Sequence, residues 1–276
     1  MIISPETLTY FTSLAEVTKG DCWEVLRLAR LGRDELRKLC MLKDHPRMKL
    51  QRHRSDSSSF SPGCLLIKGQ SRDRLGVFAS AVSYASASLV SNLRGSPSGS
   101  SPDAAPVLAF FCGLHHREPE LCDARAIMAQ FIAQLISWCR RFLHGPTVAV
   151  CRERTDDADL DEMCYLFKQL LERLLVDVDE PLRVVCVIDS LDSFVTSATS
   201  KHDVARLLQC LKDLSTSTDG RFALKLIVTT RFTAIGIGYH FSLVETIDLG
   251  DARKIGPIPG LVTRLGWKRY NIALSE

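Results

Sequence analysis

The chain has 276 residues, of which 46% are hydrophobic and 24% are charged, and its formal net charge is +3. These values are typical of a globular protein, and the length suits one large domain or one domain with an extension. The small net charge does not indicate a nucleic-acid partner. We expect no membrane span, because no apolar run reaches the roughly 18 residues that a transmembrane helix requires.

The ten cysteines are scattered along the chain, and no two of them form a CxxC pair. Several lie inside apolar runs, which favours buried, reduced thiols over a disulfide framework. The first residues, MIISPETLTYFTSLAEV, have no basic start and no continuous apolar stretch, so we expect no signal peptide. Together these features predict a cytoplasmic protein.

Residues 1–59 are expected to form a basic helical extension. Between Lys19 and Arg54 there are 11 Lys or Arg residues against 5 Asp or Glu residues. Apolar residues at helical spacing predict an amphipathic helix over 21–41, and Gly32 either weakens that helix or splits it into two. The basic face is interpreted as solvated helix surface or, alternatively, as a docking surface for an acidic partner, a membrane surface or nucleic acid.

Residues 60–250 alternate between strand-like and helix-like segments, and residues 251–276 are assigned to a C-terminal tail. Short apolar runs predict five buried strands, at 64–69, 107–112, 183–189, 224–230 and 243–249. Helical patterns lie between them, at 75–93, 123–143, 157–175 and 201–214, and Asp123 is a plausible N-cap of the second. This order predicts an α/β fold with a doubly wound, mostly parallel five-stranded sheet.

The turn after the first strand occupies the position of a phosphate-binding loop. There, backbone N–H groups and a helix N-terminus can hold phosphate oxygens, and the usual pattern is G-x-x-x-x-G-K-[ST]. Of that pattern only Gly69 is present: Arg74 replaces the second glycine, Leu75 the lysine and Gly76 the hydroxyl residue. The residues of this turn that could still contact phosphate are Gly69, Gln70, Ser71, Arg72, Arg74 and Gly76. The alternative is an ordinary strand–turn–helix with exposed arginines.

A second motif follows the third predicted strand. Asp189 ends that apolar strand, at the sheet edge where open α/β folds bind ligands, and Asp192 follows three residues later. Asp189 could hold Mg²⁺, and Asp192 could orient or activate an attacking water molecule. The alternative is that Asp189 caps the next turn and that Asp192 faces solvent.

The fourth predicted strand ends in Thr229-Thr230-Arg231 at the same edge. A guanidinium group there could bind a γ-phosphate through its planar set of donors, so Thr230 and Arg231 join the candidate nucleotide-binding residues. The alternative is a surface arginine that closes a strand.

Together these residues resemble the STAND class of P-loop NTPases, which contains the NACHT and NB-ARC domains, including those of large fungal signalling proteins. Asp189-Ser190-Leu191-Asp192 is similar to the D-G-L-D-E motif of that class, and Leu226 to Arg231 is similar to its sensor strand, in which hydrophobic residues precede T-T/S-R. The resemblance covers about residues 60–250 and implies ATP or GTP binding with Mg²⁺ and a switching role.

The departures from that pattern determine the expected function. Without the loop lysine and hydroxyl, the sequence predicts a degenerate nucleotide-binding module that hydrolyses weakly or not at all, with ATP or GTP and Mg²⁺ or with no cofactor. Such a module would act as a regulatory protein with an unidentified protein partner. The alternatives are a slow ATPase or GTPase, in which Lys68, Arg72 or Arg74 replaces the lysine, and an inactive fragment of a larger protein.

A separate cluster has possible zinc spacing. Cys112, His115, His116 and Cys122 form a C-x2-H-H-x5-C pattern after the second predicted strand. The alternative, which lacks metal, is a buried Cys112 beside exposed histidines in a loop.

Overall fold

The structure is a computed structural model of the whole chain. It describes residues 5–29, 31, 33–45, 48, 63–70, 80–94, 105–142, 159–177, 181–195, 198–216, 221–232, 236–242 and 245–250. Statements about contacts below refer to these residues.

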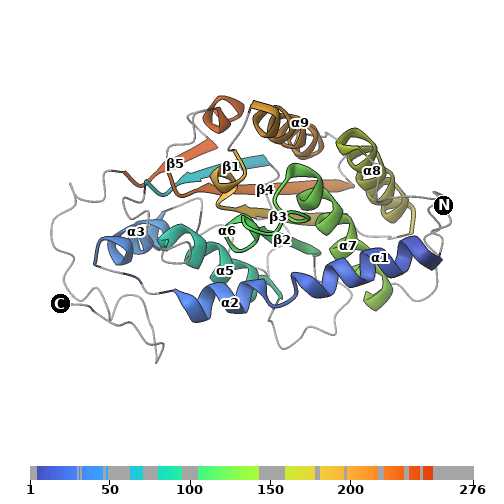
Figure 1. Cartoon of the computed structure of the whole chain (residues 1–276), viewed down its shortest axis with the longest axis horizontal. Coiled ribbons are helices and arrows are strands. Elements are labelled where there is room, and N and C mark those ends of the chain that lie inside the picture. The colour runs from blue at the N-terminus through green and yellow to red at the C-terminus, as the bar shows by residue number, and fades with distance from the viewer. Residues whose placement is uncertain are drawn as a thin grey trace.

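A five-stranded parallel sheet forms the centre of the molecule (Figure 1). Its strands are β1 (Gly63–Lys68), β2 (Val107–Phe111), β3 (Leu182–Asp189), β4 (Phe222–Thr230) and β5 (Thr246–Asp248). They lie in the order β2-β3-β4-β1-β5, and every pair of neighbours is parallel. The predicted α/β fold and its five strands are therefore confirmed, and the sheet is parallel throughout the described residues.

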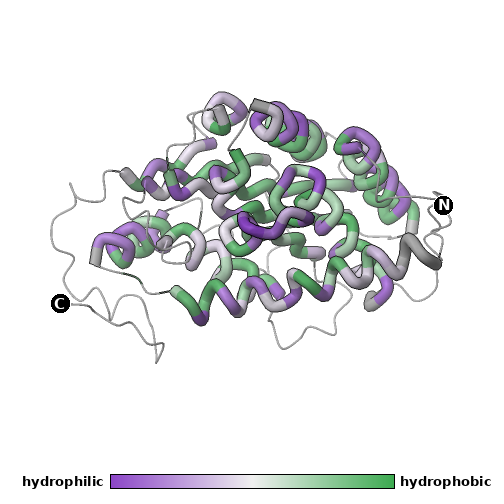
Figure 2. Tube along the Cα trace, viewed as in Figure 1, coloured by the Kyte–Doolittle hydropathy of each residue, from purple (hydrophilic) through white to green (hydrophobic). Residues whose placement is uncertain are grey.

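Successive strand residues face two separate cores, because side chains alternate between the faces of a sheet. On β1, for example, Leu66 packs into one core and Leu65 and Ile67 into the other. Figure 2 shows the resulting concentration of hydrophobic residues along the strands. Burial on both faces explains why the strands are continuous apolar runs in the sequence.

Helices α7 (Ala124–Phe142), α8 (Leu160–Asp177) and α9 (Ala198–Ser215) contribute to the core on one face of the sheet. Asp123 is the N-cap of α7, as predicted, because its Oδ1 accepts a hydrogen bond from the Ala126 N–H at 2.7 Å. The acidic first turn of α8, with Asp161 and Glu162, complements the positive end of that helix.

The other face is covered by α5 (Ala81–Arg94), and α2 (Asp21–Leu28) and α3 (Arg33–Asp44) pack against α5 (Figure 1). The separation of α2 from α3 confirms the version of the prediction in which the segment 21–41 is split into two helices. The helix predicted over 75–93 begins at Ala81 among the described residues, and residues 71–79 lie outside them.

A further helix, α1 (Pro5–Val17), lies in the extension 1–59 that was expected to be helical, although its bounds were not predicted, and it packs against α7. Phe11 of α1 is fully buried in the same core as α7, α8 and α9. Val25 of α2 and Leu42 of α3 are buried in the core on the other face. The N-terminal helices therefore complete both cores of the α/β domain.

At the β2 edge of the sheet, a side-chain amide takes the hydrogen-bonding place of a neighbouring strand. Gln134 of α7 donates from Nε2 to the Ala109 carbonyl at 2.8 Å and accepts the Ala109 N–H through Oε1 at 2.9 Å. Arg94 adds a hydrogen bond to the Val107 carbonyl at 2.8 Å. These groups satisfy the main chain of β2 on the side that has no neighbouring strand, where an unprotected edge could pair with another chain.

The chain path creates a reversal at β1. After β1 the chain crosses to the far edge at β2, returns through β3 and β4, and places β5 on the opposite side of β1. In open α/β folds, ligands bind outside the carboxyl ends of the strands near such a reversal. A ligand-binding site is therefore expected at the carboxyl ends of β1, β3 and β4, where the predicted site residues within the described ranges lie.

Candidate functional site

The carboxyl end of β3 carries a fully enclosed carboxylate. Asp189 is 2% exposed, its Oδ1 accepts a hydrogen bond from the Thr229 hydroxyl at 2.6 Å, and its Oδ2 accepts one from the Ser190 hydroxyl at 2.9 Å. Burial raises the pKa of Asp189, and hydrogen bonds from Thr229, Ser83 and Ser190 oppose that shift. Both oxygens thus already have protein donors, so a metal ion would have to compete with them.

Ser190 stands where the resembled motif has glycine, and its backbone is left-handed, with φ at 56°. This conformation costs energy for a residue other than glycine. Two hydrogen bonds hold it in place: the Ser190 N–H donates to Thr229 Oγ1 at 2.9 Å, and its hydroxyl lies 3.1 Å from the Ser83 hydroxyl of α5. The serine therefore links the ends of β3 and β4 to α5.

Asp192 lies in the short helix η2 (Leu191–Ser193) and binds the end of β4. Its Oδ1 accepts the Arg231 N–H at 2.9 Å, and its Oδ2 accepts the Phe232 N–H at 3.0 Å. Burial raises its pKa, while these two main-chain hydrogen bonds lower it. Asp192 is half-buried, and its carboxylate holds the turn after β4. A catalytic role for Asp192 stays a prediction.

The side chain of Arg231 makes a second contact between the end of β4 and η2. Its Nη2 donates to the Ser193 hydroxyl at 2.7 Å, and its guanidinium carbon lies 5.5 Å from the centre of the Phe232 ring. The structure thus brings together the two motifs that the sequence singled out, because β3 and β4 are hydrogen-bonded neighbours. In this arrangement Arg231 interacts with η2, and γ-phosphate binding by Arg231 stays a prediction.

At the end of β1, Gly69 is required by packing. Its N–H donates to the Thr230 carbonyl at 2.8 Å, and a Cβ atom at this position would lie 2.6 Å from the Val82 side chain and 3.1 Å from that carbonyl. Thr230 itself is 1% exposed, and its hydroxyl has no hydrogen-bond partner among the described residues. The glycine therefore lets α5 approach the sheet, whether or not phosphate binds.

Gln70 is held by two neighbouring elements. Its Nε2 donates to both carboxylate oxygens of Asp248 on β5, at 2.8 and 3.0 Å, and its carbonyl accepts from Lys38 of α3 at 3.3 Å. Its φ of 43° lies in the left-handed region. The remaining predicted phosphate-contacting residues, Ser71, Arg72, Arg74 and Gly76, lie outside the described residues.

The N-terminus of α5 is occupied by groups from the protein itself. The Ser80 hydroxyl accepts from the N–H groups of Val82 and Ser83, at 3.2 and 3.4 Å. The Ala81 N–H donates to a carboxylate oxygen of Glu35 at 2.6 Å, and Lys38 binds the other oxygen of Glu35 at 2.7 Å. A carboxylate from α3 thus lies at the N-terminus of α5, where the N–H groups of a helix favour an anion.

The histidines and cysteines after β2 do not gather into a metal site. Cys112 is fully buried, while His116 Nδ1 lies 2.9 Å from the Gly113 carbonyl and Cys122 bonds to the Pro119 carbonyl at 3.5 Å. His115 is buried in contact with Asp21 of α2, their atoms 2.8 Å apart. In the described part of the chain, no group of three potential metal-binding side chains is found.

The pair of His115 and Asp21 is expected to make stability depend on pH. Burial disfavours the imidazolium, but the hydrogen bonds and charges of Asp21 and Glu118 outweigh it and raise the pKa of His115. The stabilisation is then fully present below the pKa of about 6.5 of an unfolded histidine and is lost as pH rises through the folded-state value. Urea unfolding across this range should show the loss in the native protein but not in His115→Gln, and parallel curves would contradict it.

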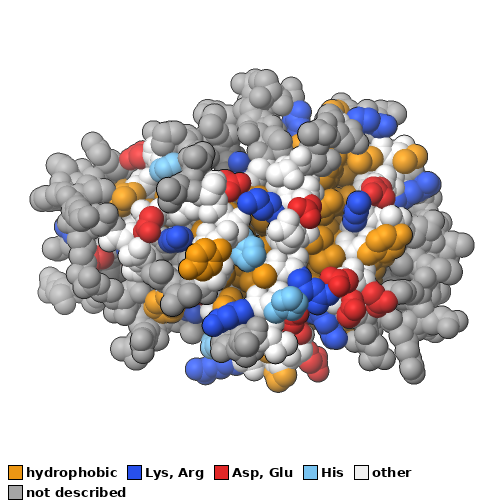
Figure 3. Space-filling model, turned by 90° about the horizontal axis from the view of Figure 1, so that it is seen from above, with side chains coloured by type: hydrophobic (Ala, Val, Ile, Leu, Met, Phe, Trp, Pro, Cys, Tyr) orange, Lys and Arg blue, Asp and Glu red, His pale blue; other side chains and the backbone are white. Residues whose placement is uncertain are grey.

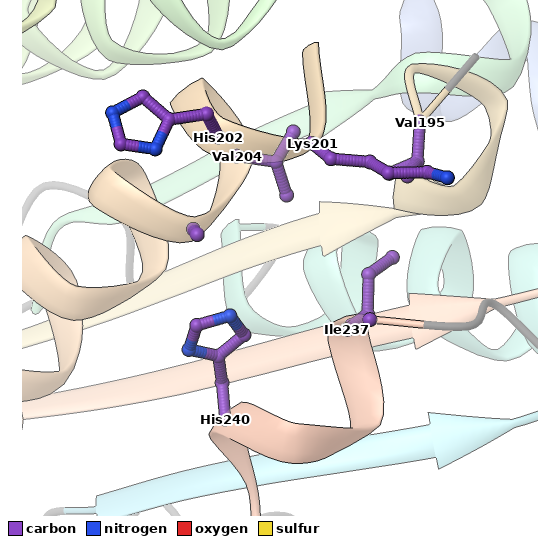
Figure 4. A pocket seen from close by; sticks show the side chains of 8 residues that line it. Val195, Lys201, His202, Val204, Ile237 and His240 are labelled. Atoms are coloured by element: carbon purple, nitrogen blue, oxygen red, sulfur yellow. The ribbon is translucent and has the colours of Figure 1, made fainter. Parts of the chain in front are cut away.

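A cavity of about 270 Å³ lies between α9 and the short helix η3 (Ile237–His240). Figure 4 shows His202 of α9 and His240 of η3 on one side, and Lys201 extending toward Val195 on the other. Burial lowers the pKa of His240, and the charge of Lys212 adds to that effect. None of the site residues predicted from the sequence lines this cavity.

None of the described helices is long and apolar enough to cross a membrane.

Comparison with known proteins finds a family whose sequence model covers most of the α/β core. No curated protein matches the chain. The sequence model of the family described as nephrocystin 3, N-terminal, matches residues 76–231. The match includes α5, the strands β2 to β4, and both Asp189 and Arg231, and it begins after β1. Because it spans more than half of the 276 residues, the chain belongs to the nephrocystin 3 N-terminal family.

Proposed function

We propose that the chain is a regulatory module, built on a P-loop NTPase-like α/β fold, that hydrolyses nucleotide weakly or not at all. The observation that carries this proposal is the Glu35 carboxylate at the N-terminus of α5. In a working phosphate-binding loop, the N–H groups of that helix hold phosphate oxygens. Here the first N–H groups of α5 are bound by Glu35 and Ser80, so a phosphate at this helix end would have to displace them.

The sequence of the loop supports the same proposal. Leu75 and Gly76 stand where an active loop has the lysine that neutralises developing charge and the hydroxyl that binds Mg²⁺. The retained acidic residues are engaged in the fold, Asp189 by two hydroxyl groups and Asp192 by two main-chain N–H groups. Bound ATP or GTP with Mg²⁺ would thus serve as a weak regulatory ligand, in the manner of the STAND proteins that the motifs resemble.

A protein is the partner class that the charge distribution favours. Basic side chains of the N-terminal helices pair with acidic neighbours three residues earlier: Lys19 with Glu16, Arg27 with Glu24, Arg37 with Asp34 and Lys38 with Glu35. Figure 3 shows acidic and basic side chains mixed over the face seen from the side of α8 and α9. A nucleic-acid surface would instead concentrate unpaired positive charge.

Thermal unfolding with and without ATP, GTP and Mg²⁺, combined with a phosphate-release assay, tests the proposal. A ligand that binds only the native state raises the midpoint as its concentration exceeds its dissociation constant. We expect at most a small shift and no phosphate release above a protein-free control. Sustained, Mg²⁺-dependent release by the purified chain would contradict the proposal and would indicate the slow ATPase or GTPase instead.

Replacing Glu35 by alanine should expose an anion position at α5. The variant loses the hydrogen bond that the Ala81 N–H donates to the charged carboxylate, and it leaves Lys38, which is 7% exposed, without its carboxylate partner. We expect the free energy of unfolding to fall by about 2 kcal/mol. Sulfate or phosphate should restore part of that loss by taking the place of the carboxylate, and urea unfolding at several sulfate concentrations measures the effect.

The matched control is Glu24→Ala. Glu24 forms a comparable pair with Arg27 on α2, but on the surface and away from any sheet end. Its loss should cost less than about 1 kcal/mol and should give no specific response to sulfate. If sulfate stabilises both variants and the native chain equally, the proposed anion position at α5 does not exist.

A further inference from the structure

Two cysteine side chains face each other across helices α8 and α9. Both helices pack on the same face of the sheet, and a hydrogen bond of 3.1 Å joins Arg206 of α9 to Asp161 of α8. Cys164 and Cys210 lie one helical turn further along α8 and α9 respectively, which places them on the same facing sides. The two thiols interact, because each of them changes the pKa of the other.

The pair is accessible and differs from the other partly exposed cysteines. Both Cys164 and Cys210 are free thiols of intermediate exposure. Cys22 and Cys122 are also partly exposed, but their thiols bond to main-chain carbonyls, those of Ala87 at 2.9 Å and Pro119 at 3.5 Å. The described part of the chain therefore offers this pair as partly exposed thiols in mutual contact.

The two thiols differ in their tendency to ionise. Their mutual interaction raises the pKa of Cys164 and lowers that of Cys210, although burial opposes the second shift. Because the thiolate is the nucleophile in disulfide exchange, this difference favours Cys210 as the attacking residue and Cys164, which faces it from α8, as the resolving residue.

We propose that Cys164 and Cys210 form a redox modification site, which is oxidised to a disulfide by exchange with a low-molecular-weight disulfide of the glutathione type. The Cys210 thiolate attacks one sulfur of oxidised glutathione, forms a mixed disulfide and expels one glutathione thiolate. Cys164 then loses its proton and attacks Cys210 Sγ, which releases the second glutathione. Two protein thiols are thereby oxidised, one glutathione disulfide is reduced to two thiols, and the two protons pass to the departing thiolates.

The disulfide would enclose the segment that carries the candidate site. β3, Asp189 and η2 all lie between residues 164 and 210. A cross-link stabilises the native state mainly by restricting the unfolded chain, and the effect grows with the length of the enclosed segment. Oxidation should therefore raise the thermal midpoint of the intact chain, and dithiothreitol should reverse the change.

The experiment incubates the purified full chain in buffers of increasing oxidised-to-reduced glutathione ratio. Thiols are then trapped with acid, alkylated and mapped by peptide mass spectrometry under non-reducing conditions. We expect the Cys164–Cys210 peptide pair to lose two hydrogen atoms in the native chain. Cys164→Ser should accumulate glutathione on Cys210, because no second thiol is left to resolve the mixed disulfide, and Cys210→Ser should form no cross-link. The control Cys122→Ser should keep the cross-link.

Two results would overturn the proposal. One is the absence of the Cys164–Cys210 cross-link under conditions that fully oxidise dithiothreitol. The other is equal glutathione loading of Cys22, Cys122, Cys164 and Cys210, which would show that exposure alone controls the reaction. Mapping of the native chain gives either answer even if a serine variant fails to fold.

Discussion

Phe11→Ala is expected to lower the free energy of unfolding by about 3–5 kcal/mol, a range typical of deleting a buried aromatic ring. Phe11 has no exposed surface and packs in the core between the sheet and α7, α8 and α9. Its ring also contacts that of Tyr10, with the ring centres 5.4 Å apart. Urea unfolding followed by circular dichroism measures the change, and we expect a single transition with a lower midpoint.

The control for this prediction is Val17→Ala on the same helix. Val17 is 52% exposed, so its truncation should change the free energy of unfolding by no more than about 0.5 kcal/mol. A negligible loss for Phe11→Ala, or an early transition that involves only a small part of the helical signal, would mean that α1 is an independent appendage. The expected result makes α1 part of the cooperative α/β unit.

The strands were predicted closely because of where they lie. β3 and β4 are central and largely buried on both faces, so each is a mostly apolar run, interrupted near its start by Arg183 and Lys225 respectively, and each differs in length from the prediction by at most two residues. β5 is an edge strand, and its described part covers three residues, of which Ile247 is buried and Asp248 exposed. Its weaker burial leaves a weaker pattern, and the prediction over 243–249 was correspondingly longer.

The bounds of helix α1 were missed although its sequence carries a signal. Tyr10, Phe11, Leu14 and Ala15 pack against the core and follow the spacing of one helix face. The apolar stripe is narrow, however, and α1 is separated from its contact α7 by more than a hundred residues. The prediction of a helical extension over residues 1–59 therefore included this segment without giving the bounds of the helix.

The candidate site could also be predicted only in part, because some of its contacts follow from the strand order and others depend on helix packing. The acidic motif after β3 and the Thr-Thr-Arg motif after β4 meet because neighbouring parallel strands end at the same edge, which the fold class alone implies. Glu35 could not be predicted in this way. Its contact with Ala81 depends on how α3 packs against α5, 46 residues further along the chain, and no local pattern encodes that packing.

Asp192→Ala is expected to lower the free energy of unfolding by about 3 kcal/mol, because it removes two hydrogen bonds from main-chain N–H groups to a charged, half-buried acceptor. Asp192→Asn should cost less, since the amide oxygen can still accept one of the two N–H groups. Chemical denaturation measures both changes. Asp203→Ala is the control, because Asp203 forms a surface pair with Arg206 at 3.5 Å and should cost less than about 1 kcal/mol.

The same two variants separate the structural role of Asp192 from the catalytic role that the sequence suggested. If Asp192 positioned an attacking water, the asparagine variant would abolish nucleotide turnover while remaining more stable than the alanine variant. If Asp192 acts only as the acceptor that holds the turn after β4, stability should fall in the order native, asparagine, alanine, with no turnover to lose. An asparagine variant as stable as the native chain would contradict the structural role, because the Arg231 and Phe232 N–H groups would then need no carboxylate.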